Sequence, residues 1–538
     1  MSNRIKGEQA LMRLKRICTL IAVLAVISSC SGKSRQGDEV ELLRAKSNRE
    51  PSSKKVILVV ADSLMYQAID EGIKRKLLPT FRYMIDNGRY YKDLVSSFPT
   101  MSVTIDSSIV TGAYPDGHHI PGLVWYSADE HRLVNYGTGP MEIMRHGVNP
   151  VLTDAIIHLN GKHLNPRIAT IYDELTSFGF KSGSINGLIY RGKTDHILAV
   201  PPYLHKPTSL PAEIKVKGPD LLALGAFTNP IGADKGLPEG IASKMGFNNE
   251  YGVEAVKQLV KARRLPDFLY VYLPDLDQRL HKEGPSDLKE VIKLDGQLNE
   301  MLESFGSKKQ ALEQAIIILI GDSGMSAIVP SGQEPVIDMP DLLKDYNILR
   351  PGSSVSKETE IVLAVNETMA YVYKLTTKTS LRNFAELLKV ESRIDLIAWE
   401  EKGWVHVIRS GSSGELRFKA IGETTDVYKQ SWALDGDWKI LYMRRGAKKE
   451  LEYGLYPDAL RRLSAALHSH EGEFLIVTAK PGYELAGHSS PAHKGGGGHG
   501  SLHRTESTVP MIILGTRVEP EYHRIVDIKK YVLKLLRR

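Results

Sequence analysis

Hydroxyl side chains and histidines lie close together in the segment 98–125, which reads FPTMSVTIDSSIVTGAYPDGHHIPGLVW. Thr100 and Ser102 precede an apolar helical stretch, and His118 and His119 follow it. A serine or threonine hydroxyl is a weak nucleophile near neutral pH unless a base or a metal ion lowers its pKa. The segment is therefore a candidate for nucleophilic chemistry only if acids and histidines from elsewhere in the chain come close to it.

Acidic residues follow three apolar runs at the same relative place. They are Asp62 after residues 56–60, Asp275 and Asp277 after residues 268–273, and Asp322 after residues 315–320. Apolar runs rich in β-branched residues are typical of strands buried on both faces of a parallel sheet. A lone acid there more often caps a helix or forms a turn. Several acids at one sheet edge would repel one another unless divalent cations neutralised them.

Histidines complete a possible metal site. Asp277 and His281 are four residues apart, a spacing that places both side chains on one side of a helix. A glycine-rich segment before the last apolar run contains His488, His493, His499 and His503. Imidazole and carboxylate together suit zinc, whereas such a segment on its own would as readily be a flexible surface loop.

The apolar runs alternate with helical patterns along the chain. Two further runs lie at residues 474–479 and 511–514, and residues 286–305 carry a helical apolar face. This alternation predicts an α/β fold, a three-layer sandwich with a mostly parallel central sheet. In such a fold the ligand site lies beyond the carboxyl ends of the strands, which is where the acids fall.

The pattern of buried runs lapses over residues 347–469. Short alternating runs and turn signals there predict an inserted α+β cap domain, so that the core would consist of residues 54–346 and 470–538. Tryptophans are more often packing residues than a binding platform. Those of the cap are Trp399, Trp404, Trp432 and Trp438. Residues 525–536 form a basic amphipathic pattern, which we expect to dock on the core rather than on a membrane.

The N-terminus resembles a bacterial lipoprotein signal. A basic stretch up to Arg16 precedes the apolar residues 17–27, which are too few to span a bilayer, and Cys30 follows at the position that is acylated in such signals. We expect residues 1–29 to be a signal peptide and residues 30–53 a flexible tether that holds the protein at the bacterial envelope, on the outer membrane or facing the periplasm. An ordinary cleaved signal with an incidental cysteine is the alternative.

Charge gives no indication of a nucleic-acid partner. Five basic residues and one acid in the first thirty positions account for +4 of the formal net charge of +7, so the rest of the chain is nearly balanced. With 538 residues, of which 42% are hydrophobic, the chain can bury a large core.

Four motifs occur together and in a recognisable order. They are FPTMS…IVTGAYPDGHHIPG, PDLDQRLHKEGP, IILIGDSGMS and GGHGSLHRTESTVPMIILG. In this order they resemble the motifs of the alkaline phosphatase superfamily, and the nearest group is the type I phosphodiesterase and nucleotide pyrophosphatase family. The resemblance implies two divalent metal ions, zinc in the family, and a serine or threonine that takes the phosphoryl group.

The resemblance also implies roles for individual residues. Counting back from IVTG at residues 109–112 places the nucleophile at Ser102, with Thr100 as the alternative. One metal would be bound by Asp277, His281 and His499. The other would be bound by Asp62 and Asp322, beside the nucleophile. The inserted cap would overhang the site and select the substrate.

Two departures from the family pattern concern the second metal and the phosphoryl oxygens. Where the family reads Asp-His-Gly, this chain has Ser323 after Asp322, so one imidazole ligand is lost. Ser323 could bind weakly, a water could replace the ligand, or a histidine could move in; the candidates are His118, His119 and His493. Leu123 stands near the place where nucleotide pyrophosphatases have an asparagine that holds the phosphoryl oxygens.

These observations favour an enzyme. We expect a metal-dependent hydrolase that cleaves phosphodiester, pyrophosphate or phosphate-ester bonds of a small, nucleotide-like molecule through a covalent phosphoserine or phosphothreonine. Sulfatases share the superfamily fold, but their nucleophile signature, Cys or Ser followed by x-Pro-x-Arg, is missing from this chain. The alternative, prompted by Ser323, is a metal-poor binding protein of the same fold that recognises a phosphorylated or glycan ligand at the cell envelope.

Overall fold

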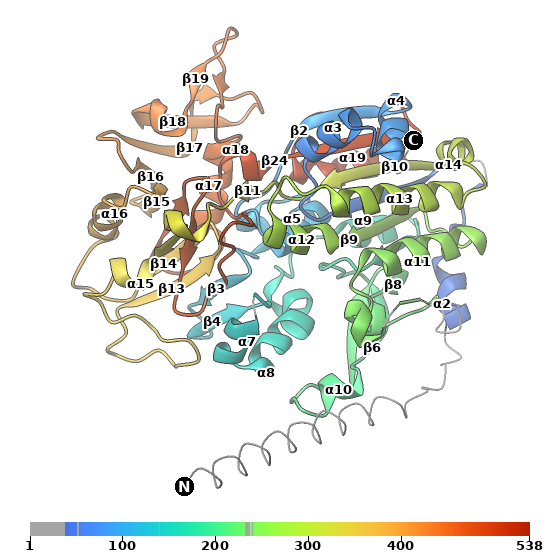
Figure 1. Cartoon of the computed structure of the whole chain (residues 1–538), viewed down its shortest axis with the longest axis horizontal. Helices are drawn as coiled ribbons and strands as arrows, with labels where there is room; N and C mark the ends of the chain where they lie inside the picture. The colour runs from blue at the N-terminus through green and yellow to red at the C-terminus, as the bar shows by residue number, and fades with distance from the viewer. Residues whose placement is uncertain (1–37, 51–52, 139, 232–236, 239, 538) are drawn as a thin grey trace, which may run out of the picture.

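The computed structural model describes residues 38–50, 53–138, 140–231, 237–238 and 240–537 (Figure 1). The expected signal peptide, residues 1–29, and the lipidated Cys30 lie outside the described residues. Within the described ranges, no helix combines the length and the apolar character that a membrane crossing requires.

A seven-stranded, mostly parallel sheet forms the centre of the larger lobe, in the order β2-β24-β10-β1-β9-β5-β8. Its strands are β1 (Lys55–Ala61), β2 (Arg89–Val95), β5 (Ser182–Ile185), β8 (Leu221–Ala223), β9 (Phe268–Leu273), β10 (Ala315–Gly321) and β24 (Thr508–Leu514). Strand β1 pairs in parallel with both β9 and β10, whereas β24 runs antiparallel between β10 and β2. The predicted mostly parallel sheet is confirmed.

Helices cover both faces of this sheet, as alternate residues of β1 show. Ile57 and Val59 pack into one apolar layer and Leu58 and Val60 into the other. The first layer contains α3 (Tyr66–Lys74), α4 (Pro79–Asp86), α11 (Asn249–Lys261), α13 (Lys289–Glu303) and α14 (Lys308–Gln314). The second contains α5 (Ser102–Thr111), α9 (Ile171–Ser177) and α19 (Ile528–Leu536). The three-layer sandwich is therefore confirmed, and the C-terminal helix docks on the core as expected.

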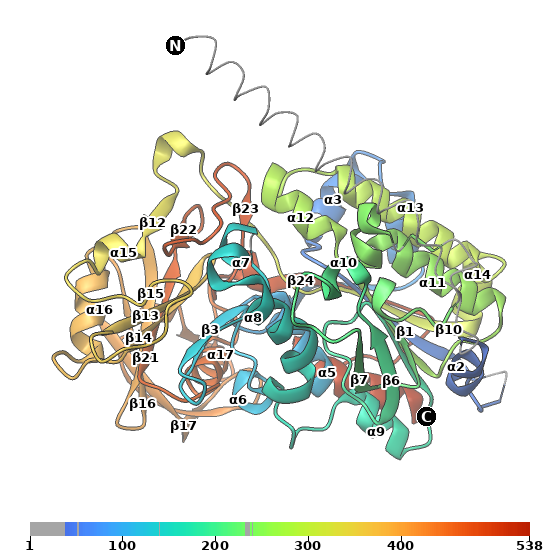
Figure 2. The same cartoon turned by 90° about the horizontal axis from the view of Figure 1, so that it is seen from below.

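A second sheet builds the smaller lobe, which we call the cap, beside the first (Figure 2). Its order is β13-β14-β21-β15-β16-β17-β18, and every neighbouring pair is antiparallel. The strands are β13 (Ile361–Asn366), β14 (Met369–Lys374), β15 (Ile394–Glu401), β16 (Trp404–Arg409), β17 (Glu415–Thr425), β18 (Ser431–Gly436) and β21 (Phe474–Ala479). Helices α16 (Leu381–Lys389) and α17 (Ala459–Leu467) cover its two faces. Trp399 and Trp432 are buried packing residues there.

Two expectations from the sequence are corrected by this arrangement. The run at residues 474–479 was expected in the central sheet, but it forms β21 between β14 and β15, because a strand buried on both faces carries no local signal of which sheet contains it. Part of the expected tether is helix α2 (Asp38–Ala45), whose Leu42 and Ala45 are buried against the core. Burial of these two side chains holds that segment in place.

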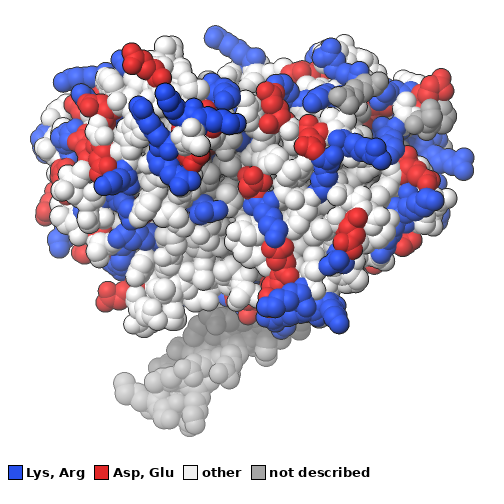
Figure 3. All heavy atoms as spheres, turned by 90° about the horizontal axis from the view of Figure 1, so that it is seen from above, with Lys and Arg blue, Asp and Glu red and all other residues white. Residues whose placement is uncertain are grey.

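Smaller elements complete the two lobes. In the larger lobe they are α6 (Pro115–His118), β3 (Val124–Ser127), β4 (Arg132–Asn135), α7 (Pro140–His146), α8 (Val148–Thr153), the π-helix η1 (Asp154–His163), β6 (Thr194–Ala199), α10 (Pro202–His205), β7 (Glu213–Gly218) and α12 (Asp275–Glu283). Later in the chain come β11 (Ser326–Ala327), β12 (Val336–Asp338), α15 (Met339–Leu342), β19 (Arg444–Arg445), β20 (Leu451–Glu452), β22 (Glu484–Ala486), β23 (Gly497–Gly498) and α18 (Arg504–Ser507). On the face drawn in Figure 3, basic and acidic side chains are interspersed.

Candidate active site

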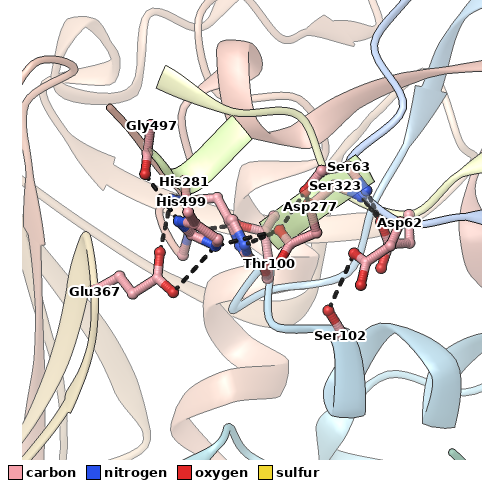
Figure 4. A network of polar contacts seen from close by, with 12 residues as sticks. Asp62, Ser63, Thr100, Ser102, Asp277, His281, Ser323, Glu367, Gly497 and His499 are labelled. Carbon is pink, nitrogen blue, oxygen red and sulfur yellow. Dashed lines mark hydrogen bonds and ion pairs between the residues drawn. The ribbon is translucent and has the colours of Figure 1, made fainter. Parts of the chain in front are cut away.

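The carboxyl ends of three parallel strands bring the three predicted aspartates together. Asp62 and Asp277 are labelled in Figure 4. Ala61 of β1 lies opposite Gly321 of β10 and Leu273 of β9. Asp62 and Asp322 therefore leave the sheet side by side, and Asp277 follows in the first turn of α12. The contacts divide the site into two clusters, with Asp277 between them. We call them the oxygen cluster (Asp62, Ser63, Ser102, Asp322 and Ser323) and the histidine cluster (Asp277, His281, Glu367 and His499).

Carboxylates and hydroxyls are the only side-chain groups of the oxygen cluster. Asp322 Oδ1 accepts the backbone N–H groups of Ser63 (2.8 Å) and Ser323 (2.6 Å). The Ser63 hydroxyl donates to Asp277 Oδ1 (2.8 Å) and lies 3.0 Å from the Ser323 hydroxyl. These serine hydroxyls therefore stand where the family's imidazole was expected.

Asp62 connects this cluster to the predicted nucleophile. The Tyr272 hydroxyl donates to Asp62 Oδ2, and the Ser102 hydroxyl lies 3.4 Å from Asp62 Oδ1. Ser102 is the first residue of α5, at the helix end where N–H groups and the helix dipole favour negative charge. A phosphoryl group attached to the Ser102 hydroxyl would therefore lie against this helix end.

The electrostatics of the oxygen cluster favour a bound cation. Burial raises the pKa of Asp62 well above its ordinary value, and the neighbouring Asp322 and Asp277 raise it further. Burial also raises the pKa of Asp322. Asp322 Oδ2 is buried and has no hydrogen-bond partner among the residues that the structure describes. An unpaired buried carboxylate oxygen among like charges fits a divalent ion.

The two rings of the histidine cluster are oriented for metal binding. His281 Nδ1 is 2.8 Å from the Gly497 carbonyl, and His499 Nδ1 is 2.5 Å from the Thr100 carbonyl. If Nδ1 carries the proton in each ring, Nε2 is left with a free lone pair. Both Nε2 atoms approach Asp277 Oδ1, at 3.2 Å from His281 and 3.3 Å from His499. Asp277, His281 and His499 can therefore act as one ligand group, as the resemblance implied.

Mutual attraction stabilises the charges of this cluster in the absence of an ion. Burial opposes charge on both partners, but His281 and His499 hold the pKa of Asp277 well below its ordinary value. Against the effect of burial, Glu367 and Asp277 raise the pKa of His499 to about 9. A metal that binds Nε2 must therefore displace a proton.

Thr100, the alternative nucleophile, occupies a different environment from Ser102. Its side chain is buried, its hydroxyl accepts the Gly500 N–H (2.7 Å), and it lies 3.4 Å from the Ser501 carbonyl. Ser102 is only partly buried. These contacts fix Thr100 to the loop that carries His499, so the geometry favours Ser102 as the nucleophile.

The histidines considered as substitutes for the lost imidazole lie in other environments. Both His118 ring nitrogens are engaged, with the Ser108 hydroxyl (3.0 Å) and the Ile120 N–H (3.1 Å). His119 is exposed. The His493 ring lies 4.3 Å from the His281 ring, between centroids, so His493 adjoins the histidine cluster.

Leu123 is held by the cap. Its N–H donates to the Asn366 side-chain oxygen (2.8 Å), which also accepts the Val124 N–H (3.0 Å). The Asn366 amide in turn donates to the Val124 carbonyl (2.8 Å). This asparagine therefore ties β13 to the segment that follows α5 and α6.

Sequence reasoning missed three residues of the site. Ser63 follows Asp62 directly, and this adjacency was a usable signal. Tyr272 belongs to the apolar run of β9, where an inward-facing hydroxyl gives no pattern. Glu367 stands in the turn between β13 and β14. Its Oε1 lies 3.6 Å from His281 Nε2, and its Oε2 accepts the His499 N–H (3.1 Å).

A further cluster of metal-ligating residues lies on the π-helix η1. Arg132 binds both carboxylate oxygens of Asp154, at 2.7 Å each. The two ring nitrogens of His163 contact the Tyr136 hydroxyl (2.8 Å) and Glu130 (3.1 Å). These groups already satisfy one another, so we interpret the cluster as a structural ion-pair network.

Comparison with known proteins agrees with this geometry. The sequence model of the family described as type I phosphodiesterase / nucleotide pyrophosphatase matches residues 56–502. A search of curated proteins gives no match. Similar solved structures include mouse ectonucleotide pyrophosphatase/phosphodiesterase 5, an inactive form in complex with AMP (14% identity, 90% of this chain and 95% of that chain, TM-score 0.52). Phosphonoacetate hydrolase from Sinorhizobium meliloti in complex with phosphonoformate is also similar (16% identity, 94% and 100% coverage, TM-score 0.53).

At these identities the structural likeness supports the fold alone, whereas the family model covers most of the chain. The strand order, the acids at the strand ends and this match lead to one assignment. The chain belongs to the type I phosphodiesterase / nucleotide pyrophosphatase family of the alkaline phosphatase superfamily, and at the family level it is a phosphoester hydrolase.

Proposed function

We propose that this protein is a metal-dependent phosphohydrolase that cleaves phosphodiester, pyrophosphate or phosphate-ester bonds through a phosphoserine at Ser102. The observation that supports this most directly is the position of the Ser102 hydroxyl. It lies at the N-terminal end of α5 and 3.4 Å from Asp62 Oδ1. The same cluster contains Asp322 Oδ2, which has no hydrogen-bond partner within the described part of the chain.

The donor atoms of the two clusters suit two different ions. Asp277, His281 and His499 offer two imidazoles and a carboxylate, a set that zinc prefers. The oxygen cluster offers carboxylates and hydroxyls, which magnesium or manganese accept more readily than zinc does. Ions bound there would polarise the phosphoryl oxygens and lower the pKa of a bound hydroxyl or water.

The protein's own residues then have distinct parts in the reaction. The Ser102 oxygen attacks phosphorus and gives up its proton toward Asp62 Oδ1, while the bond from phosphorus to the leaving oxygen breaks. Tyr272 fixes the orientation of Asp62 through its other oxygen. The N–H groups at the start of α5 face the negative phosphoryl oxygens. A water molecule then attacks phosphorus and the bond to Ser102 breaks. The serine oxygen takes back the proton held by Asp62, and phosphate or a phosphomonoester leaves with both protons of the water.

We also propose that the substrate is a small phosphate ester met at the cell envelope, where the protein is held by a lipid on Cys30. The signal-like residues 1–29 support this placement. Mass spectrometry of the mature N-terminus tests it. A lipidated Cys30 is expected, and an unmodified N-terminus at another residue would contradict the anchor.

The catalytic proposal is tested with bis-p-nitrophenyl phosphate and p-nitrophenyl phosphate as substrates and with zinc and manganese supplied. Ser102→Ala should abolish turnover and the phosphorylated protein seen by mass spectrometry after acid quenching. Ser107→Ala is the matched control, since its hydroxyl donates to the Val103 carbonyl of the same helix and has no other hydrogen-bond partner in the described ranges. Turnover of Ser102→Ala at the wild-type rate would move the nucleophile to Thr100 or overturn the mechanism.

One observation keeps a binding protein as the second candidate. The Ser63 hydroxyl is bonded to Asp277 and adjoins Ser323, so hydroxyls fill the place of the expected imidazole. A protein that bound a single ion and a phosphorylated ligand without turnover would be consistent with the loss of this imidazole ligand. Elemental analysis separates the two cases, because two metals per chain support the enzyme and one or none supports the binder.

A further inference from the structure

The hairpin of β13 and β14 places a carboxylate of the cap against the histidine cluster of the core (Figure 4). Glu367 at the hairpin turn directs Oε1 to within 3.6 Å of His281 Nε2. Its Oε2 accepts the backbone N–H of His499 at 3.1 Å. The side chain is therefore held between the two histidines, and one oxygen faces the same atom that a metal would use.

The distances fit a tetrahedral centre. Zinc–nitrogen and zinc–oxygen bonds of about 2.0–2.1 Å place neighbouring ligand atoms about 3.3 Å apart in a tetrahedron. Asp277 Oδ1 lies 3.2 Å from His281 Nε2 and 3.3 Å from His499 Nε2, and Glu367 Oε1 lies 3.6 Å from His281 Nε2. Glu367 Oε1 therefore lies at about the right distance from His281 Nε2, although Glu367 groups with His281 and His493 and must approach Asp277 and His499 to share their ion.

A shared histidine limits this part of the site to one ion. His281 belongs to two potential ligand groups, one with Asp277 and His499 and the other with Glu367 and His493. Its Nδ1 is occupied by the Gly497 carbonyl, so only Nε2 remains. Because one lone pair binds one metal, the two groups cannot hold two ions at once through His281. The His493 Nδ1 is 2.7 Å from Glu484, which would orient that ring from outside.

The backbone at Glu367 is unfavourable for this residue type. Asn366 and Met369 are the last paired residues of the hairpin, so Glu367 and Thr368 form a two-residue turn. Glu367 has a φ of +58°, the left-handed region, at the first turn position, where glycine is the favoured residue. Residues held in this region cluster at active and ligand-binding sites.

We propose that Glu367 is a ligand of the metal in the histidine cluster, so that this centre has four protein ligands and metal binding fastens the cap to the core. The inference rests on the proposed function only in requiring that Asp277, His281 and His499 bind a metal. With four protein ligands, a water would have to take a fifth position, an expansion that zinc permits.

The test measures zinc binding to the full-length protein in the absence of substrate. Metal-free wild type, Glu367→Gln and Glu367→Gly are titrated with zinc against a fluorescent chelator, and thermal unfolding is followed with and without zinc. Glu386→Gln, on the outer helix α16, is the control. We expect the zinc affinity of the histidine cluster to fall by about 10-fold to 100-fold in both Glu367 variants. The rise in melting temperature on adding zinc should shrink with it.

Two further readouts separate a ligand from a merely structural residue. Glu367→Gly relieves the left-handed strain, so its metal-free melting temperature should match or exceed that of the wild type while its zinc affinity falls. Hydrogen exchange of residues 361–374 should slow when zinc is added to the wild type and should not respond in Glu367→Gln.

The outcomes distinguish this inference from the proposed function. Equal zinc affinities in wild type, Glu367→Gln and Glu367→Gly would overturn the ligand role of Glu367 and leave the hydrolase proposal intact. A wild type that binds no zinc would overturn both. A Glu367→Gly variant that loses its metal-free stability together with its affinity would also count against the ligand role, because a structural defect would then explain the loss.

Discussion

The oxygen cluster and the histidine cluster share Asp277 as a neighbour yet are built in opposite ways. In the histidine cluster each imidazole contacts a backbone carbonyl through Nδ1, and the ligands come from the core, the glycine-rich loop and the cap. The oxygen cluster draws on strand ends and one helix start, and hydroxyls stand in place of a nitrogen ligand. If both clusters bind ions as proposed, we expect the histidine cluster to retain its ion and the oxygen cluster to exchange its ion more readily.

The largest effect is expected from removing the negative charge that the oxygen cluster presents to Ser102. Asp62→Asn should lower turnover by more than about 100-fold, beyond the range typical of residues that only orient a ligand. Zinc bound to the histidine cluster should remain, so elemental analysis should find one zinc per chain. Asp86→Asn, a surface variant that loses only an ion pair with Arg82, is the control. Loss of all metal in Asp62→Asn would contradict the independence of the two clusters.

Next in size is the effect of making the two clusters alike. Ser323→His restores the imidazole of the family pattern, and zinc prefers nitrogen to a neutral hydroxyl. We expect the zinc affinity of the oxygen cluster to rise by about 10-fold to 100-fold, which is the usual effect of one group beside a metal on its affinity. Chelator competition measures it. No gain in affinity would mean that the Ser323 position does not face the second ion.

A smaller effect is expected when the ions are exchanged rather than the residues. Metal-free protein reloaded with zinc and manganese together should turn over bis-p-nitrophenyl phosphate faster than protein reloaded with zinc alone, because the oxygen cluster prefers the harder ion. The measurement is initial rate against metal composition. Highest activity with zinc alone would show that the donor atoms do not determine which ion each cluster prefers.

The smallest effect is the contribution of Asp106, a buried residue of α5, to the pH dependence of stability. Tyr270 donates to Asp106 of α5 much as Tyr272 donates to Asp62, and burial raises the pKa of Asp106 to about 7. Between about pH 4 and 7 the folded protein keeps a proton that the unfolded chain has released, so stability should fall as the pH rises through this window. The slope from one group cannot exceed about 1.4 kcal/mol per pH unit. Asp106→Asn should flatten it in thermal unfolding, and an unchanged slope would assign it to other groups.

Much of the fold could be predicted because its signals are local. The buried runs that became β1, β9 and β10 carry their own composition, and the rule for parallel sheets places the residues after them at one edge. The four-residue spacing of Asp277 and His281 predicted their contact for the same reason. Local pattern combined with topology brought the three aspartates and His281 together, whereas the choice of Ser102 and His499 came from the resemblance to the family.

The rest depends on tertiary contacts that have no local signal. Residues 474–479 look like a central strand, but their sheet is chosen by neighbours more than seventy residues away, as in the pairing with β15. Glu367 lies in a hairpin turn whose sequence favours no function, and only the docking of the cap brings it to His281. Helix α2 is held by the burial of two side chains, too few to give an apolar period.

The contact between Thr100 and the loop at His499 and Gly500 joins residues 399 and 400 positions apart. During synthesis, Asp62, Asp277 and Asp322 emerge long before His499 does. Because domains fold as units while long-range closure comes late, we expect the strands to assemble first around carboxylates that have no histidine partner. The site would then become complete only when the glycine-rich loop and the adjoining strand β24 have left the ribosome. A chain truncated before residue 499 would lack His499, β24 and α19, so we expect neither a complete central sheet nor phosphohydrolase activity from it.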